Sequence, residues 1–365
     1  MPTDLIGALI VVRDLRGLVK VNPLAGSSDD DVATYTLLHR VPRKRRVQST
    51  VVSGTTDRPV DQGDRWVARD MLGPMVDDLA SLPTRVLVQG MAHHDGTIVA
   101  AEVLPVADAC GQTREQVRSC LRRLVSEGLY VREGEGRTSV FRATDAGLAS
   151  MGMQLDRHRL AFAQDAAGRG WDRNWHLVAF AIPETKRAAR DGLRDQLRSL
   201  GGALLQNGIY VSPHAWESEV RSAAQRLGVT DHLTTATTQD LHMGDERDPR
   251  ELARRLWNID ELAERYESFV TTYRDVPERL EDMRAHRERL TDADFQPGAL
   301  WIGVQFGECF ENDPLLPPEL LPRPWPGREA REILAKCRRL GMLIREENQA
   351  PPLFAIWDDV LRALL

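Results

Sequence analysis

Residues 111–142 combine a helix pattern with a hairpin pattern, and this combination constrains the fold of the chain more than any other stretch. Gln112 and Thr113 offer a helix start, and apolar side chains then recur at three- and four-residue spacing along one face. The other face carries arginine and serine. Gly128 favours a helix end, because a residue without a Cβ atom adopts the conformation found there. Two short runs of strand character follow, on either side of a glycine-rich tip at residues 134–136.

This composition is expected of a DNA recognition helix with a wing beside it. Arginine side chains on such a helix reach phosphates or guanine edges in a major groove. By helix position alone, Gln112, Arg118 and Ser119 are candidates for base contacts. The candidate DNA-binding residues together are Gln112, Thr113, Arg114, Arg118, Ser119, Arg122, Arg123, Arg132 and Arg137. Taken alone, the same stretch also fits a solvated helix and an ordinary hairpin in an α+β domain.

The charge of the whole chain makes this basic patch a local feature. The 365 residues carry a formal net charge of −6, so a nucleic-acid contact must come from a local patch and not from overall attraction to polyanions. The apolar run at residues 5–12 is too short to span a membrane and lacks the preceding basic residues of a signal peptide. We therefore expect a cytoplasmic protein without a membrane contact.

The cysteines predict neither a metal site nor disulfides. The chain has 4 cysteines, without a C-x-x-C pair and without a histidine at ligand spacing. They are expected to pack as small apolar side chains. We also find no phosphate-binding glycine loop, no dinucleotide fingerprint and no catalytic triad with meaningful spacing, so the sequence predicts no enzyme and no cofactor.

The segments before the recognition helix complete a winged-helix order. Two helices are predicted, the first with Pro83 in its first turn and the second at residues 100–110, so the order is helix, helix, turn, helix, hairpin. Residues 1–78 have no clear fold. Their basic cluster at residues 40–46 is typical of a solvated linker, with a DNA-tracking arm as the alternative.

A second unit follows with alternating strand and helix patterns. Residues 175–182 are apolar on both faces, as in a central strand, and Asn207 and Gly208 predict a tight hairpin turn. The order βαββαβ predicts a ferredoxin-like domain. Helices dominate after residue 245, interrupted by a proline-rich stretch at residues 314–326.

The expected fold is therefore α+β and multidomain, with a winged helix-turn-helix, then a ferredoxin-like βαββαβ domain, then a mostly helical C-terminal domain. Its expected parts are an N-terminal extension of uncertain fold (1–78), a winged helix DNA-binding domain (79–168), a ferredoxin-like middle domain (169–245) and a helical C-terminal domain (246–365).

From about residue 82 onward, the chain resembles the PaaX family of transcriptional repressors, named for control of phenylacetate degradation. Four stretches carry the resemblance: TREQVRSCLRRLVSEG with GRTSVFRAT, WHLVAFAIP with NGIYVSPH, LWNI with the helix after it, and DPLLPPELLPRPWPG. The resemblance implies a homodimer whose two winged helices bind a pseudo-palindromic operator in double-stranded DNA. It also implies release from DNA by a coenzyme A (CoA) thioester.

A CoA thioester needs an apolar slot for its acyl group and basic residues for its phosphates. The residues that we expect to form this effector site are Trp257, Tyr266, Tyr273, Trp301, Trp325, Arg254 and Arg323. Aromatic residues at helical spacing are also typical of a core. Two other functions stay open: a DNA-binding or interaction module without an effector, and a metal-dependent nuclease similar to the CRISPR-associated adaptation endonuclease. The strand at residues 175–182 ends without the carboxylate that holds the metal in that nuclease.

Overall fold

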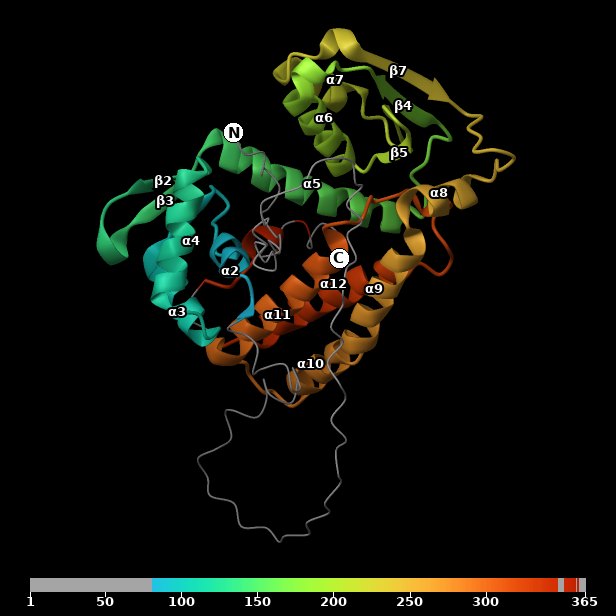
Figure 1. Cartoon of the computed structure of the whole chain (residues 1–365). Coiled ribbons are helices and arrows are strands. Elements are labelled where there is room, and N and C mark those ends of the chain that lie inside the picture. The colour runs from blue at the N-terminus through green and yellow to red at the C-terminus, as the bar shows by residue number, and fades with distance from the viewer. Residues whose placement is uncertain (1–80, 347–350, 359, 361–365) are drawn as a thin grey trace, which may run out of the picture. The chain divides into compact units, whose positions relative to one another are not determined.

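The computed structural model describes residues 81–346, 351–358 and 360. All of these residues belong to one compact unit with helices and two antiparallel sheets, which confirms the mixed α+β class (Figure 1). The expected N-terminal extension at residues 1–78, including its basic cluster at residues 40–46, lies outside the described residues. The same is true of residues 361–365, the end of a helix that the sequence predicts over residues 354–365.

The first part of the described chain packs three helices against a small sheet. The strand order is β1-β3-β2, and both pairs are antiparallel. Sequence reasoning missed β1, whose three residues have no local pattern and are held by pairing with β3, where Ile98 lies opposite Phe141. The elements are α2 (Thr84–Gly90), β1 (Thr97–Val99), α3 (Ala100–Ala109), α4 (Arg114–Ser126), β2 (Tyr130–Glu133), a 3₁₀ turn (Gly136–Thr138) and β3 (Val140–Ala143).

A long helix, α5 (Asp145–Ala167), leads out of this part. Its first turn is capped by Thr144, whose hydroxyl accepts a hydrogen bond from the backbone N–H of Gly147. Further along, Arg157 donates hydrogen bonds to the backbone oxygens of Phe310 and Asp313, far away in sequence. The helix is thereby attached to the C-terminal part of the chain along its second half.

The second sheet has the strand order β5-β6-β4-β7, and every neighbouring pair is antiparallel. As predicted, β4 is a central strand, and Asn207 and Gly208 form the turn between β5 and β6. The elements are β4 (Trp175–Phe180), α6 (Arg187–Ser199), β5 (Ala203–Gln206), β6 (Ile209–Ser212), α7 (Glu217–Arg226) and β7 (Leu233–Thr238), with single 3₁₀ turns at Glu184–Lys186 and Thr230–His232.

Both faces of the sheet are covered at β4, which explains why this strand is apolar on both faces apart from His176. On one face, Val178 packs with side chains of α6 and α7 such as Leu193 and Val220. On the other face, Trp175 packs with Leu252 of α8 and with Leu316 of the proline-rich stretch. The sheet is therefore a central layer with helices on one side and α8 with the proline-rich segment on the other.

The C-terminal part is mostly helical, as predicted. Its elements are α8 (Pro249–Trp257), α9 (Ile259–Tyr273), α10 (Val276–Ala285), α11 (Asp292–Phe310), a 3₁₀ turn (Pro318–Leu320), α12 (Pro326–Ile344) and a second 3₁₀ turn (Ala355–Trp357). The sequence predicts this helix over residues 300–311, but α11 begins earlier, at Asp292, and accommodates Pro297 inside it. Within the described ranges, no helix is both long and apolar enough to cross a membrane.

Candidate nucleic-acid interface

Helix α4 begins at a capping box. The hydroxyl of Thr113 accepts a hydrogen bond from the backbone N–H of Gln116, and the Gln116 side chain accepts one from the backbone N–H of Thr113. This reciprocal pair satisfies two backbone donors that a helix start leaves without intrahelical partners. The start of α4 is therefore fixed by its own sequence. Thr113 is exposed but has this structural role in addition to any contact with DNA.

The inner face of α4 anchors it to the domain. Val117, Leu121 and Leu124 are at most 4% exposed and belong to a core shared with α2, α3 and the first sheet. At the C-terminal end, Arg85 of α2 donates to Glu127, with 2.7 Å between Nη1 and Oε2. Apolar packing and this ion pair fix the rotation of α4 about its axis, and hence the direction of its outer face.

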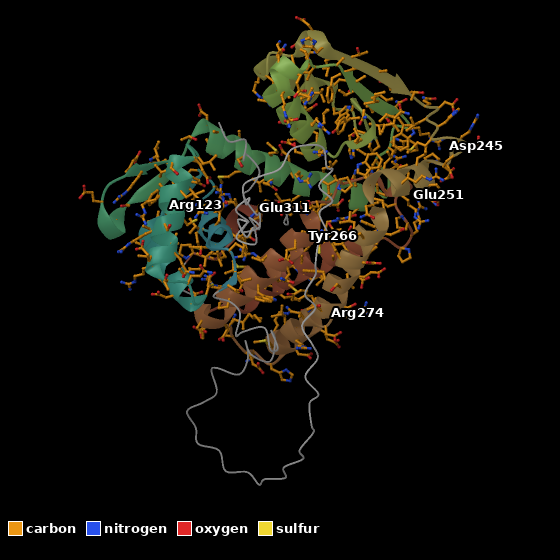
Figure 2. All side chains as sticks on the ribbon, viewed as in Figure 1. Arg123, Asp245, Glu251, Tyr266, Arg274 and Glu311 are labelled. Atoms are coloured by element: carbon orange, nitrogen blue, oxygen red, sulfur yellow. The ribbon has the colours of Figure 1, made fainter. Side chains whose placement is uncertain are left out.

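The outer face of α4 is polar, cationic and exposed. Arg114, Arg118, Ser119, Arg122 and Arg123 all lie on it (Figure 2 labels Arg123). Arg122 is bonded to Glu115, with 3.0 Å between Nη2 and Oε1, and Arg114 lies 3.9 Å from Asp108. The contacts found among the described residues include no ion pair of Arg118 or Arg123. These two side chains are the most available cations on the helix.

Gln112 does not belong to this face, which corrects the expected base contact. Its side chain is buried, and its Nε2 donates to the backbone oxygen of Leu82 at 2.8 Å. Its Oε1 accepts from the hydroxyl of Thr84 at 2.5 Å. The amide therefore ties the start of α4 to the start of α2. A contact with DNA would need both hydrogen bonds to break in the interior.

The hairpin of β2 and β3 lies beside α4 in Figure 1. Arg132 is exposed, and its guanidinium donates to the Ser139 hydroxyl at 3.0 and 3.2 Å. Arg142 forms an ion pair with Glu133 across the two strands at 2.8 Å. The side chain of Arg137, near the tip, lies outside what the structure describes. The hairpin thus presents at least one cation next to the outer face of α4.

The middle sheet offers no arrangement for metal chemistry in its described residues. After β4 the chain continues through Ala181, Ile182 and Pro183, none of which can bind a metal through its side chain. In the ranges that the structure describes, no group of three or more His, Cys, Asp or Glu side chains is placed to hold a metal ion. The four cysteines are buried thiols, as predicted, and burial raises the pKa of Cys110 and Cys337 to about 12.

Most of the aromatic residues expected at the effector site belong to the core. Tyr266, labelled in Figure 2, is fully buried, and its hydroxyl donates a hydrogen bond to Asp313 at 2.8 Å. Trp301 is 8% exposed. Trp257 stacks on Trp175 and donates to the backbone oxygen of Gly201. Trp325 is half-buried against Tyr266. These side chains pack against neighbouring elements.

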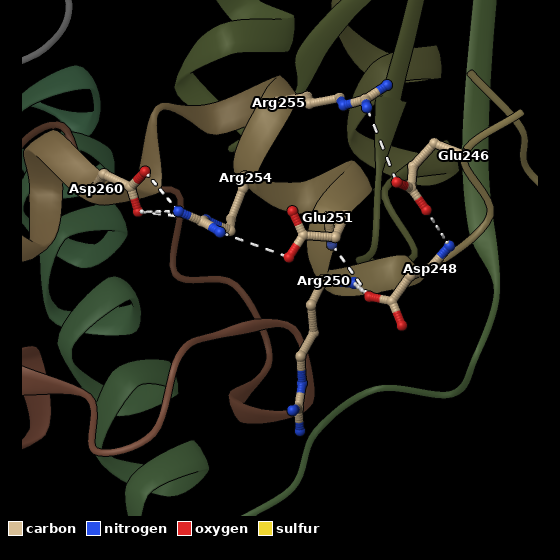
Figure 3. Close-up of polar contacts among 7 residues, drawn as sticks. All are labelled: Glu246, Asp248, Arg250, Glu251, Arg254, Arg255 and Asp260. Carbon is tan, nitrogen blue, oxygen red and sulfur yellow. Dashed lines mark hydrogen bonds and ion pairs between the residues drawn. The ribbon is translucent and has the colours of Figure 1, made fainter. Parts of the chain in front are cut away.

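Arg254 and Arg323, the two residues expected to bind the phosphates of an effector, do not line the cavity described in the next paragraph. Arg254 on α8 is bonded to Asp260 at 2.9 Å and lies 3.5 Å from Glu251, so two carboxylates already neutralise it (Figure 3). The neighbouring Arg255 lies 3.8 Å from Glu246. Arg323 is exposed in the proline-rich stretch. None of these arginines lines the cavity described next.

The C-terminal helices line a cavity of about 140 Å³, partly open to solvent, that sequence reasoning did not find. Its wall is formed by side chains of α5, α9, α10, α11, α12 and the segment after residue 351, together with Leu290. Of the expected effector residues, only Tyr273, at the end of α9, lines it. A wall assembled from separate elements leaves no local signal in the sequence, apart from the aromatic residues Phe354 and Trp357 near the C-terminus.

Comparisons with known proteins point to one family. Residues 168–253 match the family described as PaaX protein central Cas2-like domain, and residues 257–341 match the family described as PaaX-like protein C-terminal domain. The chain is 26% identical over 253 residues to the transcriptional repressor PaaX of Escherichia coli (strain K12), covering 69% of this chain and 77% of that protein. A solved structure of an uncharacterized protein from Mycobacterium tuberculosis is 24% identical, covers 67% of this chain and 88% of that chain, and has a TM-score of 0.42.

Proposed function

Because the chain belongs to the PaaX family, we propose that it is a transcriptional regulator that binds operator DNA through α4 and the β2–β3 hairpin. The observation that carries this proposal is the outer face of α4. It presents Arg114, Arg118, Arg122 and Arg123 to solvent on a helix whose orientation is fixed by a buried underside. A local cationic face in an acidic protein is the electrostatic pattern that phosphate recognition needs.

The arrangement around α4 supports a winged-helix reading. The order of α2, β1, α3, α4, β2 and β3, with strands paired as β1-β3-β2, leaves α4 exposed and the hairpin beside it. In such a domain the second helix of the helix-turn-helix unit enters the major groove and the hairpin lies along the backbone. The strand order β5-β6-β4-β7 likewise supports a ferredoxin-like middle domain.

We assign base reading to Arg118 and Ser119, and phosphate contacts to Arg114, Arg122 and Arg132. Arg118 lies at the centre of the outer face, and the contacts found among the described residues give it no ion pair. Its guanidinium can therefore bind a guanine edge without first breaking an ion pair within the protein. Arg114 and Arg122 have weak exposed carboxylate partners, which phosphate oxygens can replace.

The experiment is a binding assay of the full chain on DNA upstream of its own operon and on random DNA of equal length. Arg118→Ala should weaken specific binding by about 1–3 kcal/mol and random binding much less. Arg221→Ala, which removes an exposed arginine from α7, is the matched control and should bind both DNAs like the wild type. Equal losses on both DNAs for Arg118→Ala would contradict the base-reading role.

The regulator acts, in this proposal, as a homodimeric repressor of an aromatic or acyl-CoA catabolic operon and is released by a CoA thioester. Two copies on a pseudo-palindromic operator need recognition helices spaced by about one helical turn of DNA. An effector releases the dimer if it prefers a geometry that misses this spacing. A panel of acyl- and aryl-CoA thioesters, added to the protein–operator complex, tests this directly. If the protein–operator complex persists with every thioester, the proposed effector class is wrong and the protein is a regulator without a CoA-thioester effector.

The nuclease alternative has a direct test of its own. The family that matches residues 168–253 is described as Cas2-like, which is a reason to test for nuclease activity. However, β4 is followed by apolar residues and Pro183. Without a carboxylate there, the chain lacks the residue that would hold a catalytic metal. We expect purified protein with Mg²⁺ or Mn²⁺ to leave DNA intact, and metal-dependent cleavage would reverse this assignment.

A further inference from the structure

Residues 351–358, called the C-terminal segment below, contact α2, α5, α11 and α12. Leu353 and Phe354 lie in a turn at its centre and are only 0% and 8% exposed. A buried turn has no helix or sheet ladder to satisfy its backbone groups, so other parts of the protein must supply the partners. The identity of these partners shows what the segment holds together.

Helix α11 holds the start of the segment through one side chain. Gln296 of α11 is 0% exposed. Its Nε2 donates to the backbone oxygen of Pro351 at 3.2 Å, and its Oε1 accepts from the backbone N–H of Leu353 at 3.0 Å. A single amide can do both because it carries a donor and an acceptor. Removing it would leave two buried backbone groups without these partners.

Helices α12 and α5 hold the end of the segment. Arg338 of α12 donates two hydrogen bonds to Asp358, at 2.8 and 3.0 Å. The side chain of Arg338 is only 10% exposed, so solvent screens this ion pair little. The ring of Trp357 packs edge-on against His158 of α5, with 4.4 Å between ring centroids. Both ends of the segment are therefore fixed to the helices outside the DNA-binding part.

The centre of the segment contacts α2, which belongs to the DNA-binding part. The backbone N–H of Phe354 donates to the backbone oxygen of Gly90, the last residue of α2, at 2.6 Å. The last carbonyl groups of a helix have no partner within the helix, so the segment completes the end of α2. The ring of Phe354 packs between Gly90 and Gly303 of α11, where added Cβ atoms would lie 2.6 and 2.8 Å from it.

The backbone of Phe354 is in the left-handed region, with φ of 63°. A phenylalanine keeps this conformation only where its surroundings hold it there. Here the bond to Gly90 and the packing of the ring between two helices supply that constraint. The turn is therefore built around its contact with α2.

Helix α2 is in turn attached to both ends of α4. Gln112 at the start of α4 forms hydrogen bonds with Leu82 and Thr84, and Arg85 of α2 pairs with Glu127 after the end of α4. A shift of α2 is transmitted to α4, because a packed interior cannot absorb it locally. The C-terminal segment thus contacts the helix that determines where α4 lies.

We propose that the C-terminal segment is a latch that fixes the orientation of the DNA-binding part on the C-terminal helices, with Gln296 as its positioning residue. The consequence for DNA rests on the proposed function as a dimeric regulator. A loosely held DNA-binding part still binds one half-site. Two copies bind a full operator tightly only where both recognition helices are held at the spacing of the half-sites. The latch therefore acts on the recognition of spacing and not on the reading of bases.

The latch is tested by hydrogen exchange of the full chain without DNA. Gln296→Leu keeps the size of the side chain and removes both bonds to the segment. It should raise the exchange rates of the Phe354 amide and of the last turn of α2 together, by about tenfold or more. Gln305→Leu makes the same change at a half-buried position of α11 and should alter neither rate. Faster exchange at Phe354 with α2 unchanged overturns the latch.

A second variant keeps this test decisive if Gln296→Leu does not fold. Asp358→Asn retains the shape of the side chain and weakens the bond to Arg338 at the other end of the segment. It should raise the same two exchange rates to a smaller extent. An increase at Phe354 alone, or no change at either place, contradicts the latch.

The consequence for DNA is measured on the operator fragment and on the same fragment with one half-site scrambled. Gln296→Leu should bind the full operator about fivefold or more weakly and the single half-site like the wild type. Moving the half-sites apart by about two base pairs should weaken the wild type more than Gln296→Leu. Equal losses on both fragments, or equal sensitivity to spacing, overturn the positioning role. A wild type that binds no DNA refutes the proposed function, while hydrogen exchange still decides the latch.

Discussion

A buried ion pair holds α5 to α12, and its removal gives a prediction that can be worked from the structure. Arg331 of α12 is only 5% exposed in its side chain, and its guanidinium donates two hydrogen bonds to Asp165 of α5, at 2.5 and 2.9 Å. Its Nη1 lies 3.8 Å from the buried carboxylate of Asp313. Burial opposes the charge of Arg331, but the bonds to Asp165 outweigh it and raise the pKa of Arg331.

Arg331→Met removes the cation and leaves two carboxylates in low-dielectric surroundings. Breaking a buried pair from one side typically costs about 3–5 kcal/mol, because the remaining charge is uncompensated. Asp165 is 16% exposed, so partial hydration places the expected loss near the lower end, at roughly 3 kcal/mol. For a domain of about 150–250 residues this corresponds to a fall in melting temperature of about 6–12 °C.

Urea denaturation followed by circular dichroism measures this loss. The double variant Arg331→Met with Asp165→Leu should recover much of the stability, since an apolar pair can replace a buried ion pair at little net cost. Arg159→Met is the control, because Arg159 pairs with Asp156 on the exposed face of α5 and should contribute little. A double variant no more stable than Arg331→Met would refute the claim that uncompensated charge causes the loss.

Three further predictions concern the start of α4, the cavity and the contact of α2. Gln112→Ala should lower the free energy of unfolding by about 1–3 kcal/mol in urea denaturation, because it removes a buried amide that forms hydrogen bonds at the start of α2. Under conditions in which the variant is folded, its affinity for operator DNA should equal that of the wild type. Burial lowers the pKa of His158 to about 3, so His158 binds a proton at higher pH in the unfolded chain than in the folded chain. The free energy of unfolding should therefore fall as pH decreases from about 6.5 to 3, by up to about 1.4 kcal/mol per pH unit. In urea denaturation at pH 7 and pH 5, His158→Phe should show a smaller loss than the wild type. Gly90→Ala should displace the Phe354 ring, because a new Cβ atom would lie 2.6 Å from Cε1, and should lower the free energy of unfolding in urea denaturation, whereas Gly152→Ala, where nothing lies near a new Cβ atom, should not.

The sequence predicted the elements that depend on local patterns. The capping residue Thr113 and the apolar spacing after it predicted α4, and the order of strands and helices in the middle unit agrees with the structure. The apolar residues on both sides of β4 predicted that both of its faces are packed. These features are visible in sequence because their causes lie within about ten residues of chain.

The features that sequence reasoning missed depend on contacts between distant segments. Strand β1 forms because it pairs with β3, more than 40 residues later. Gln112 is buried because its side chain forms hydrogen bonds with Leu82 and Thr84, about 30 residues earlier. The expected effector aromatics were chosen by residue type, and the fold uses Tyr266 and Trp301 to fill its core. The cavity could not be predicted, because its wall is assembled from helices and segments that are far apart in sequence.

The claim that the outer face of α4 contacts DNA is tested most directly by the salt dependence of operator binding. Each phosphate contact contributes about −0.9 to the slope of log K against log salt concentration. The variant with both Arg114→Ala and Arg122→Ala should therefore have a slope shallower by about 1.8 than the wild type. The slope for the Arg221→Ala control should be unchanged. An identical slope for the double variant and the wild type would contradict the proposed interface.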